Sequence, residues 1–201
     1  NSANYLHILT ETMKYAYADR SKYLGDPDFT DIPLEKLLSK SYADRIRTHI
    51  NMNHARPSTE IGPGQNLPAE SPDTTHYSIA DSKGNVVSNT YTLNFSYGSG
   101  FVIAGTGILL NNEMDDFSAK VGSQNAYGLL GGKANSIGPQ KRPLSAMTPT
   151  IVLKDGKPYL IVGSPGGSKI INAVLQVILN VIDHKMNIAD ASSVPRIHHQ
   201  W

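Results

Sequence analysis

A change in the spacing of apolar residues divides this chain of 201 residues and limits what it can fold into. Before residue 51, apolar side chains such as Leu6, Leu9 and Met13 recur every three or four positions, which is the period of an amphipathic helix. From Thr74 onward they alternate with polar side chains, which is the period of a strand. Helices followed by antiparallel strands predict the α+β class.

The stretch between the two patterns, residues 51–73, has no apolar period. It places Pro57, Pro63 and Pro68 among Asn, Ser, Thr and Glu residues. Loops of this length are uncommon in compact domains unless they are functional or disordered. We therefore expect a linker that ends at Thr74.

The individual elements follow from the same periods. Helices are expected from Tyr5 to the break at Gly25, over residues 33–38 and 42–50, and over the apolar stretch 170–182. Strands are expected at 74–81 and 86–94, with shorter ones at 101–104 and 108–111 and a hairpin of 150–154 with 159–162. Residues 121–143 are glycine-rich and predict a loop.

Composition excludes several classes of function. The formal net charge of +1 gives no electrostatic reason to expect nucleic acid or an anionic membrane as a partner. No apolar run is long enough to span a bilayer. The absence of cysteine excludes disulfides, a thiol nucleophile and thiolate metal sites. The chain begins at Asn1 without methionine, so we expect a fragment, whose lack of a signal peptide says nothing about export.

Four stretches carry a specific resemblance, and they follow one another in a characteristic order. They are Thr74-Thr75-His76-Tyr77-Ser78, Leu110-Asn111-Asn112-Glu113-Met114-Asp115-Asp116-Phe117, Lys141-Arg142-Pro143-Leu144-Ser145 and Gly163-Ser164-Pro165-Gly166-Gly167-Ser168. Together with Pro195-Arg196 and the final His198-His199-Gln200-Trp201, they resemble bacterial γ-glutamyltranspeptidases over essentially the whole chain.

This resemblance implies an N-terminal-nucleophile hydrolase with a four-layer αββα sandwich, of which this chain is a truncated part. Residues 1–73 would be the end of the large subunit and residues 74–201 most of the small catalytic subunit, both made from one precursor. The bond between Asp73 and Thr74 would be cut by the protein itself. Export to the periplasm or secretion is implied by the family alone.

Thr74 is the candidate nucleophile. A threonine hydroxyl needs a base, and an N-terminal threonine carries one in its own α-amine, which titrates near ~8. An internal threonine has only an amide nitrogen, so Thr74 becomes competent only after cleavage. Taken alone, Thr74-Thr75 reads better as a pair of ordinary strand formers, and only the family resemblance reverses this interpretation.

The remaining catalytic and binding roles also come from the resemblance. Thr92 would orient the nucleophile, and period two sets Thr90, Thr92 and Asn94 on one strand face. An ordinary polar face on an edge strand would give the same pattern. Asn94 would contact the substrate's amino or carboxylate group, and the acidic pair Glu113 and Asp116 would hold its ammonium. Asp115 is expected to be structural.

Ser145 resembles a serine that binds the substrate α-carboxylate, and Ala146 stands where many family members have a second serine. The amides of Gly166 and Gly167 resemble an oxyanion hole, although a Gly-Gly pair before a helix is also a common helix-start turn. Residues 121–132 resemble a mobile lid, with Tyr127 as the aromatic residue that closes over the pocket.

The expected reaction transfers the γ-glutamyl group of glutathione or another γ-glutamyl amide to water, an amino acid or a peptide. No cofactor is implied, and no metal is expected, because the acidic cluster has no histidine at ligand spacing. Two alternatives stay open: a related acylase or poly-γ-glutamate-processing enzyme on the same scaffold, and a catalytically silent fragment.

Overall fold

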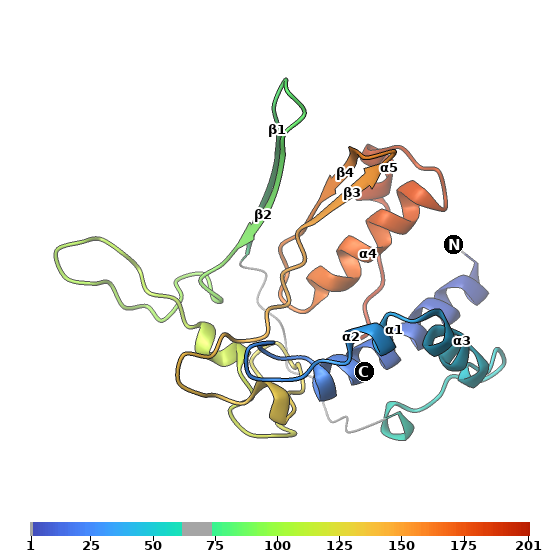
Figure 1. Cartoon of the computed structure of the whole chain (residues 1–201), viewed down its shortest axis with the longest axis horizontal. Coiled ribbons are helices and arrows are strands. Elements are labelled where there is room, and N and C mark those ends of the chain that lie inside the picture. Colours follow the sequence, from blue (N-terminus) through green and yellow to red (C-terminus); the bar gives the residue numbers. More distant parts are fainter. Residues whose placement is uncertain (1, 62–73) are drawn as a thin grey trace. The chain divides into compact units, whose positions relative to one another are not determined.

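The computed structural model describes residues 2–61 and 74–201 (Figure 1). They form two compact units that interleave along the sequence. Unit 1 contains the described residues of Asn1–Ala69, with Met114–Leu144 and His199–Trp201; unit 2 contains those of Glu70–Glu113 and Ser145–His198. The predicted cleavage would divide the chain at one bond, between Asp73 and Thr74. The two units instead divide it at several positions along the sequence.

Unit 1 is built on the long helix α1 (Ala3–Tyr23). The helix begins after Ser2, whose Oγ accepts a hydrogen bond from the Tyr5 backbone N–H at 3.2 Å, and it ends before Gly25, as predicted. Its buried apolar face carries Leu9, Met13 and Tyr17. The two shorter helices are also confirmed, as α2 (Leu34–Leu37) and α3 (Lys40–His49).

The rest of unit 1 is irregular, as the glycine-rich sequence of residues 121–143 predicts. Short 3-10 helices interrupt the irregular chain: η1 (Ser58–Glu60), η2 (Glu113–Asp116) and η3 (Lys133–Asn135). The first residue of η2 belongs to unit 2. An ion pair holds this part to the turn after α1, where the Arg142 guanidinium donates to the Asp26 carboxylate at 2.6 Å. The Arg142 backbone N–H donates to the same carboxylate at 2.8 Å.

Unit 2 contains two antiparallel hairpins. β1 (Thr75–Ala80) pairs with β2 (Val86–Tyr91), and β3 (Thr150–Lys154) pairs with β4 (Lys157–Val162). Side-chain hydrogen bonds join the hairpins, because the hydroxyls of Ser88 and Ser78 donate to the backbone carbonyls of Val162 and Ile161, at 3.2 and 3.5 Å.

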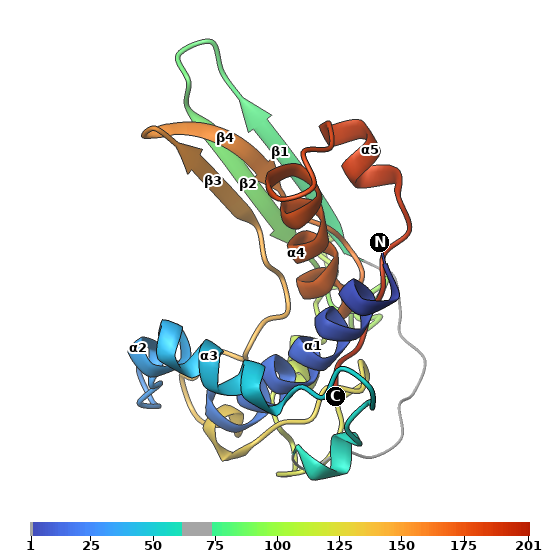
Figure 2. The ribbon, with the colours of Figure 1, turned by 90° about the vertical axis from the view of Figure 1, so that its right-hand side faces the viewer.

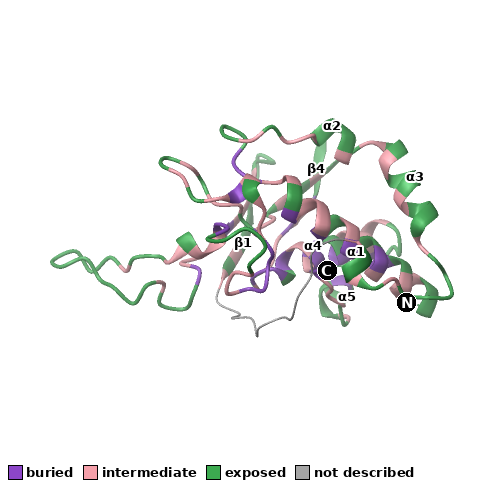
Figure 3. Ribbon diagram, turned by 90° about the horizontal axis from the view of Figure 1, so that it is seen from below, coloured by how far each residue is buried: buried purple, intermediate pink, exposed green. Residues whose placement is uncertain are grey.

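The core of unit 2 lies between the β3–β4 hairpin and helix α4 (Lys169–Ile182), which confirms the predicted apolar helix. Figure 2 shows α4 lying along the hairpins, and Figure 3 shows its buried residues. The buried cluster consists of Leu160, Val162, Ile170, Val174, Val177 and Ala191. Ala191 comes from α5 (Ile188–Ser193), a helix too short to give a clear apolar period, whose start is capped by the Asn187 side chain.

Three predicted strands need correction. β2 ends at Tyr91 rather than Asn94, because Asn94 adopts a left-handed conformation with φ 76° that no strand can continue. The shorter strands 101–104 and 108–111 are reduced to one isolated bridge between Val102 and Leu109. This segment is almost wholly exposed (Figure 3), so no packed face stabilises a longer ladder.

Candidate active site

Thr74 lies directly before β1, at the open end of the first hairpin. The ladder pairs Thr75 with Tyr91, so Thr74 and Thr92 each follow directly on the last pair of the ladder. Both threonines line a pocket of about 350 Å³. The other residues of this pocket are Thr75, Tyr91, Leu93, Phe95 and Ser96. The predicted nucleophile and its predicted orienting hydroxyl are therefore brought together, whereas Asp73 lies outside the described residues.

Thr92 and Asn94 form a tight turn instead of a strand face, which corrects the prediction that Thr90, Thr92 and Asn94 share one face. The Asn94 backbone N–H donates to Thr92 Oγ1 at 2.9 Å, which is the local bond that serine and threonine make in turns. Asn94 is 2% exposed, and its Nδ2 donates to the Asn112 carbonyl at 3.2 Å. This turn therefore joins the end of β2 to the segment that precedes Glu113.

The oxyanion candidates lie between β4 and α4. Gly166 has φ +125° and Gly167 has φ +54°, both in the region that favours glycine. Their carbonyls accept hydrogen bonds from the N–H groups of Lys169 and Ile170, at 3.1 and 3.2 Å. The pair therefore sits at the entry of α4, where the helix dipole favours negative charge.

His76 connects β1 to the segment around Gly163, a contact that the sequence did not reveal. Its ring fills the space beside Gly163, where an added Cβ would lie 2.1 Å from the imidazole. Its Nδ1 lies 2.7 Å from Thr90 Oγ1, and its Nε2 lies 3.1 Å from Ser78 Oγ. Burial lowers the pKa of His76, which favours a neutral ring. The imidazole thus packs β1, which follows Thr74, against the segment that leads to Gly166.

Ser145 is exposed, and its Oγ accepts a hydrogen bond from the Met147 backbone N–H at 3.0 Å. Ala146 beside it is buried. The serine thus caps a local turn at the point where the chain enters unit 2.

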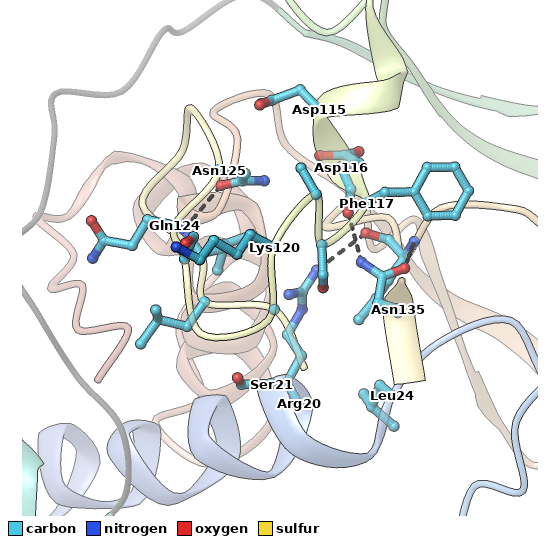
Figure 4. A pocket seen from close by; sticks show the side chains of 17 residues that line it. Arg20, Ser21, Leu24, Asp115, Asp116, Phe117, Lys120, Gln124, Asn125 and Asn135 are labelled. Carbon is cyan, nitrogen blue, oxygen red and sulfur yellow. Dashed lines mark hydrogen bonds between the residues drawn. The ribbon is translucent and has the colours of Figure 1, made fainter. Parts of the chain in front are cut away.

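Asp116 belongs to unit 1, while Glu113, at the start of the same 3-10 turn, belongs to unit 2. Figure 4 shows Asp116 in a cavity of about 100 Å³ that Arg20 and Asn135 also line. Burial lowers the pKa of Arg20, and the nearby charge of Asp116 opposes that shift. Sequence reasoning identified Asp116 and missed Arg20 and Asn135, because neither lies in a local motif that carries chemistry.

The remaining predictions concern Asp115, Tyr127 and metal ions. The Asp115 carboxylate accepts hydrogen bonds from the Ala126 N–H at 3.0 and 3.2 Å, which agrees with a structural role. Tyr127 is 5% exposed within unit 1, in a turn where Asn125 Oδ1 accepts from its N–H at 3.0 Å. In the part of the chain that the structure describes, no three His, Cys, Asp or Glu residues gather as metal ligands, and no helix is long and apolar enough to cross a membrane.

The predicted site residues are thus divided between the units. Unit 2 holds Thr74, Thr92, Asn94, Glu113, Ser145, Gly166 and Gly167, whereas unit 1 holds Asp116 and Tyr127.

Comparison with known proteins gives matches over the whole chain. The family model described as Gamma-glutamyltranspeptidase matches residues 1–201. The glutathione hydrolase proenzyme of Escherichia coli (strain K12) is 58% identical over 200 residues, which make up 100% of this chain and 34% of that protein. The chain therefore spans about a third of the length of the curated relatives it matches.

Two solved structures also resemble this chain in fold. The Helicobacter pylori γ-glutamyltranspeptidase T380A mutant superposes with a TM-score of 0.62 and 66% identity, over 63% of this chain and 68% of that one. The cephalosporin acylase of Bacillus halodurans superposes with a TM-score of 0.66 and 27% identity, over 93% of this chain and 31% of that one. The mixed α and β architecture is therefore that of these enzymes.

Proposed function

Because the chain belongs to the γ-glutamyltranspeptidase family, we propose that it carries the nucleophile of a γ-glutamyltransferase and glutathione hydrolase. The observation that carries this proposal is Thr74 directly before β1, in an open pocket that Thr92 also lines. The 58% identity to a glutathione hydrolase proenzyme over the whole chain supports it.

The first step would be self-cleavage. Thr74 Oγ attacks the carbonyl carbon of Asp73, and the acyl group moves from nitrogen to oxygen. Water then hydrolyses this ester, which leaves a carboxylate on Asp73 and a free α-amine on Thr74. Residues 1–73 become the end of a large subunit and residues 74–201 most of a small subunit. The assembled subunits would adopt the four-layer αββα sandwich.

Turnover would use the new α-amine as a base. The amine takes the proton of Thr74 Oγ as this oxygen attacks the γ-carbonyl carbon of a γ-glutamyl amide. The backbone amides of Gly166 and Gly167 stabilise the resulting oxyanion, and Thr92 orients the hydroxyl. The intermediate collapses to a γ-glutamyl ester on Thr74 as the ammonium returns its proton to the leaving amine. Water, an amino acid or a peptide then takes the acyl group.

The substrate head group carries both an ammonium and a carboxylate, and each charge needs a partner once it leaves water. Glu113 and Asp116 would hold the ammonium, Asn94 would contact the head group, and Ser145 would donate to the carboxylate. Tyr127 would close the pocket through movement of residues 121–132. The resemblance to bacterial enzymes of this family also suggests a periplasmic or secreted location.

A direct test is acyl-enzyme trapping in the natural full-length protein. Incubation with a γ-glutamyl amide, followed by acid quench and peptide mass mapping, should place one γ-glutamyl group on the peptide that begins with Thr74. A Thr74→Ala variant should show neither this adduct nor turnover. An adduct on another residue would contradict the proposal.

A second candidate is a related acylase, which the similarity to a cephalosporin acylase favours. The two candidates differ in the acyl group. An acylase should release a glutaryl group at least as fast as a γ-glutamyl group, because its pocket has no need to match an ammonium. A γ-glutamyl enzyme should strongly prefer the substrate with the ammonium.

A further inference from the structure

The pocket beside Thr74 lies wholly within unit 2 and combines apolar surface with hydroxyl groups. Its apolar surface comes from Tyr91, Leu93 and Phe95, and every other described residue that lines it is a threonine or a serine. None of these residues carries a charged side chain. The pocket therefore offers a ligand apolar contacts and neutral hydrogen bonds, and its lining side chains offer no ion pair.

The two aromatic side chains of this pocket leave much of their surface open. Tyr91 is 56% exposed, and Phe95 is 37% exposed. Single exposed apolar residues are normal on a protein surface, so exposure alone says little. What distinguishes Tyr91 and Phe95 is that both line one pocket together with the proposed nucleophile. Aromatic faces in such a place provide a large apolar contact for a ligand.

Asn112 holds the segment that carries Leu93 and Phe95. The Phe95 N–H donates to Asn112 Oδ1 at 3.1 Å, and the Asn112 N–H donates to the Leu93 carbonyl at 3.1 Å. Between these two residues, Asn94 Nδ2 donates to the Asn112 carbonyl at 3.2 Å. Tyr91 is held by the ladder, where it pairs with Thr75. A surface that is fixed before a ligand arrives loses less entropy when the ligand binds.

The lack of charge decides which part of a substrate this pocket suits. The γ-glutamyl head group carries two charges, and each needs a partner once it leaves water. The unit 2 residues proposed as such partners, Glu113 and Ser145, are not among the residues that line the pocket. The scissile bond also has an amine side, and this amine must lie beside Thr74 whenever the bond breaks or forms.

We propose that Tyr91 and Phe95 form the subsite for the amine side of the reaction and select acceptors with an aromatic or large apolar side chain. This inference rests on the proposed function. The acceptor nitrogen attacks the ester carbonyl carbon of the γ-glutamyl group on Thr74. The bond from this carbon to Thr74 Oγ breaks, and the Thr74 α-amine carries a proton from the attacking nitrogen to Oγ. The acceptor side chain packs against the two aromatic rings.

The test is a competition between two acceptors in the natural full-length protein. γ-Glutamyl-p-nitroanilide forms the intermediate in the presence of equal concentrations of phenylalaninamide and alaninamide, and mass spectrometry measures both transfer products. Because both products arise from the same intermediate, their ratio does not depend on how fast that intermediate forms. We expect the product of phenylalaninamide to exceed that of alaninamide about tenfold.

Substitution of either aromatic residue should weaken this preference. Tyr91→Ala and Phe95→Ala should each lower the product ratio by about threefold to tenfold, because each removes one aromatic contact with the acceptor. Tyr91→Phe keeps the ring and should keep the ratio. Each ratio is read from a single sample, so partial loss of active protein cancels. Tyr91 is more than half exposed, and Tyr91→Ala decides the question if Phe95→Ala does not fold.

Tyr97→Ala is the matched control. Tyr97 follows Phe95 by two positions and is 75% exposed, but it is not among the residues that line the pocket. This variant should leave the product ratio unchanged. A fall as large as that in Tyr91→Ala would mean that the preference does not arise in this pocket.

Two further results would overturn the inference: equal use of both acceptors by the unsubstituted protein, or an unchanged ratio in both Tyr91→Ala and Phe95→Ala. An unchanged ratio combined with a lower melting temperature would show that another part of the full-length protein covers these rings. Failure of the unsubstituted protein to transfer or hydrolyse the γ-glutamyl group at all would instead overturn the proposed function on which the inference rests.

Discussion

The region around Thr74 in unit 2 and the region around Asp116 in unit 1 are organised in opposite ways. Strand pairing and a tight turn position Thr74 and Thr92, and the pocket they line is open. Asp116 lies in a cavity lined by side chains from distant parts of the sequence, the half-buried Arg20 and the buried Asn135, and Asn135 donates a hydrogen bond to its backbone carbonyl. Backbone pairing thus fixes the proposed nucleophile, while side-chain hydrogen bonds fix one proposed ligand of the head group.

Because of this difference, we expect substitutions in the two regions to affect different properties of the protein. In unit 2, changes that disturb the backbone should lower kcat, because they would displace the proposed nucleophile or the proposed oxyanion donors. In unit 1, changes to buried polar side chains should alter substrate selectivity and stability, because they displace ligands rather than reacting atoms.

The largest effect is expected from Gly166→Ala. The added methyl group has room, since its nearest neighbour would be Lys169 Cβ at 3.8 Å, but φ +125° is unfavourable for alanine. The backbone should rotate and misdirect the amide, which lowers kcat about 100-fold or more with a smaller change in KM. Steady-state kinetics on γ-glutamyl-p-nitroanilide measure this.

Gly100→Ala is its matched control, because Gly100 also has a positive φ, 71°, and open space. It should leave kcat unchanged. Similar kcat losses in both variants would mean that Gly166 has no special part in the reaction.

Gly163→Ala should disturb the same region through packing. The new Cβ would lie 2.1 Å from the His76 ring, so the ring must move and its packing between β1 and Gly163 is lost. We expect a loss of about 1–3 kcal/mol in the free energy of unfolding and a kcat lowered roughly tenfold. Adding His76→Ala should restore part of the stability, because it removes the clash. A double variant as unstable as the sum of the single changes would contradict this contact.

Ala146→Ser tests the head-group side by adding a hydroxyl beside Ser145. If the carboxylate binds there, KM for the γ-glutamyl amide should fall by roughly threefold to tenfold. KM for the 4-aminobutyryl amide, which has no carboxylate, should not fall. A parallel decrease for both substrates would place the new hydroxyl away from the carboxylate.

The smallest effect concerns pH and stability. Hydrogen bonds from the Arg142 side chain and backbone hold the pKa of Asp26 well below its usual range. A carboxyl with a lowered folded pKa stabilises the fold above its unfolded pKa of about 3.9, and this stability is lost as the pH falls further. In Asp26→Asn, melting temperatures should be lower than those of the unsubstituted protein at neutral pH, and the two should converge under acid conditions. Parallel curves would contradict this.

The sequence predicted the α+β class and most elements, since the periods of α1, α4 and the two hairpins are local signals. It failed where tertiary contacts decide. The positive φ of Asn94 ended β2 early, and the exposed segment 101–111 lacked a surface on which to pair. It also missed the contributions of Arg20, Asn135 and His76, because a supporting residue is recognised only by what it touches.

The most direct test of the central claim is the intact mass of the natural full-length protein after incubation at neutral pH, together with the N-terminal sequence of any product. The account predicts two chains, the smaller of which begins at Thr74, and a Thr74→Ala variant that stays whole. A protein that remains uncut, or a Thr74→Ala variant cut at the same bond, would contradict the assignment of Thr74 as the nucleophile.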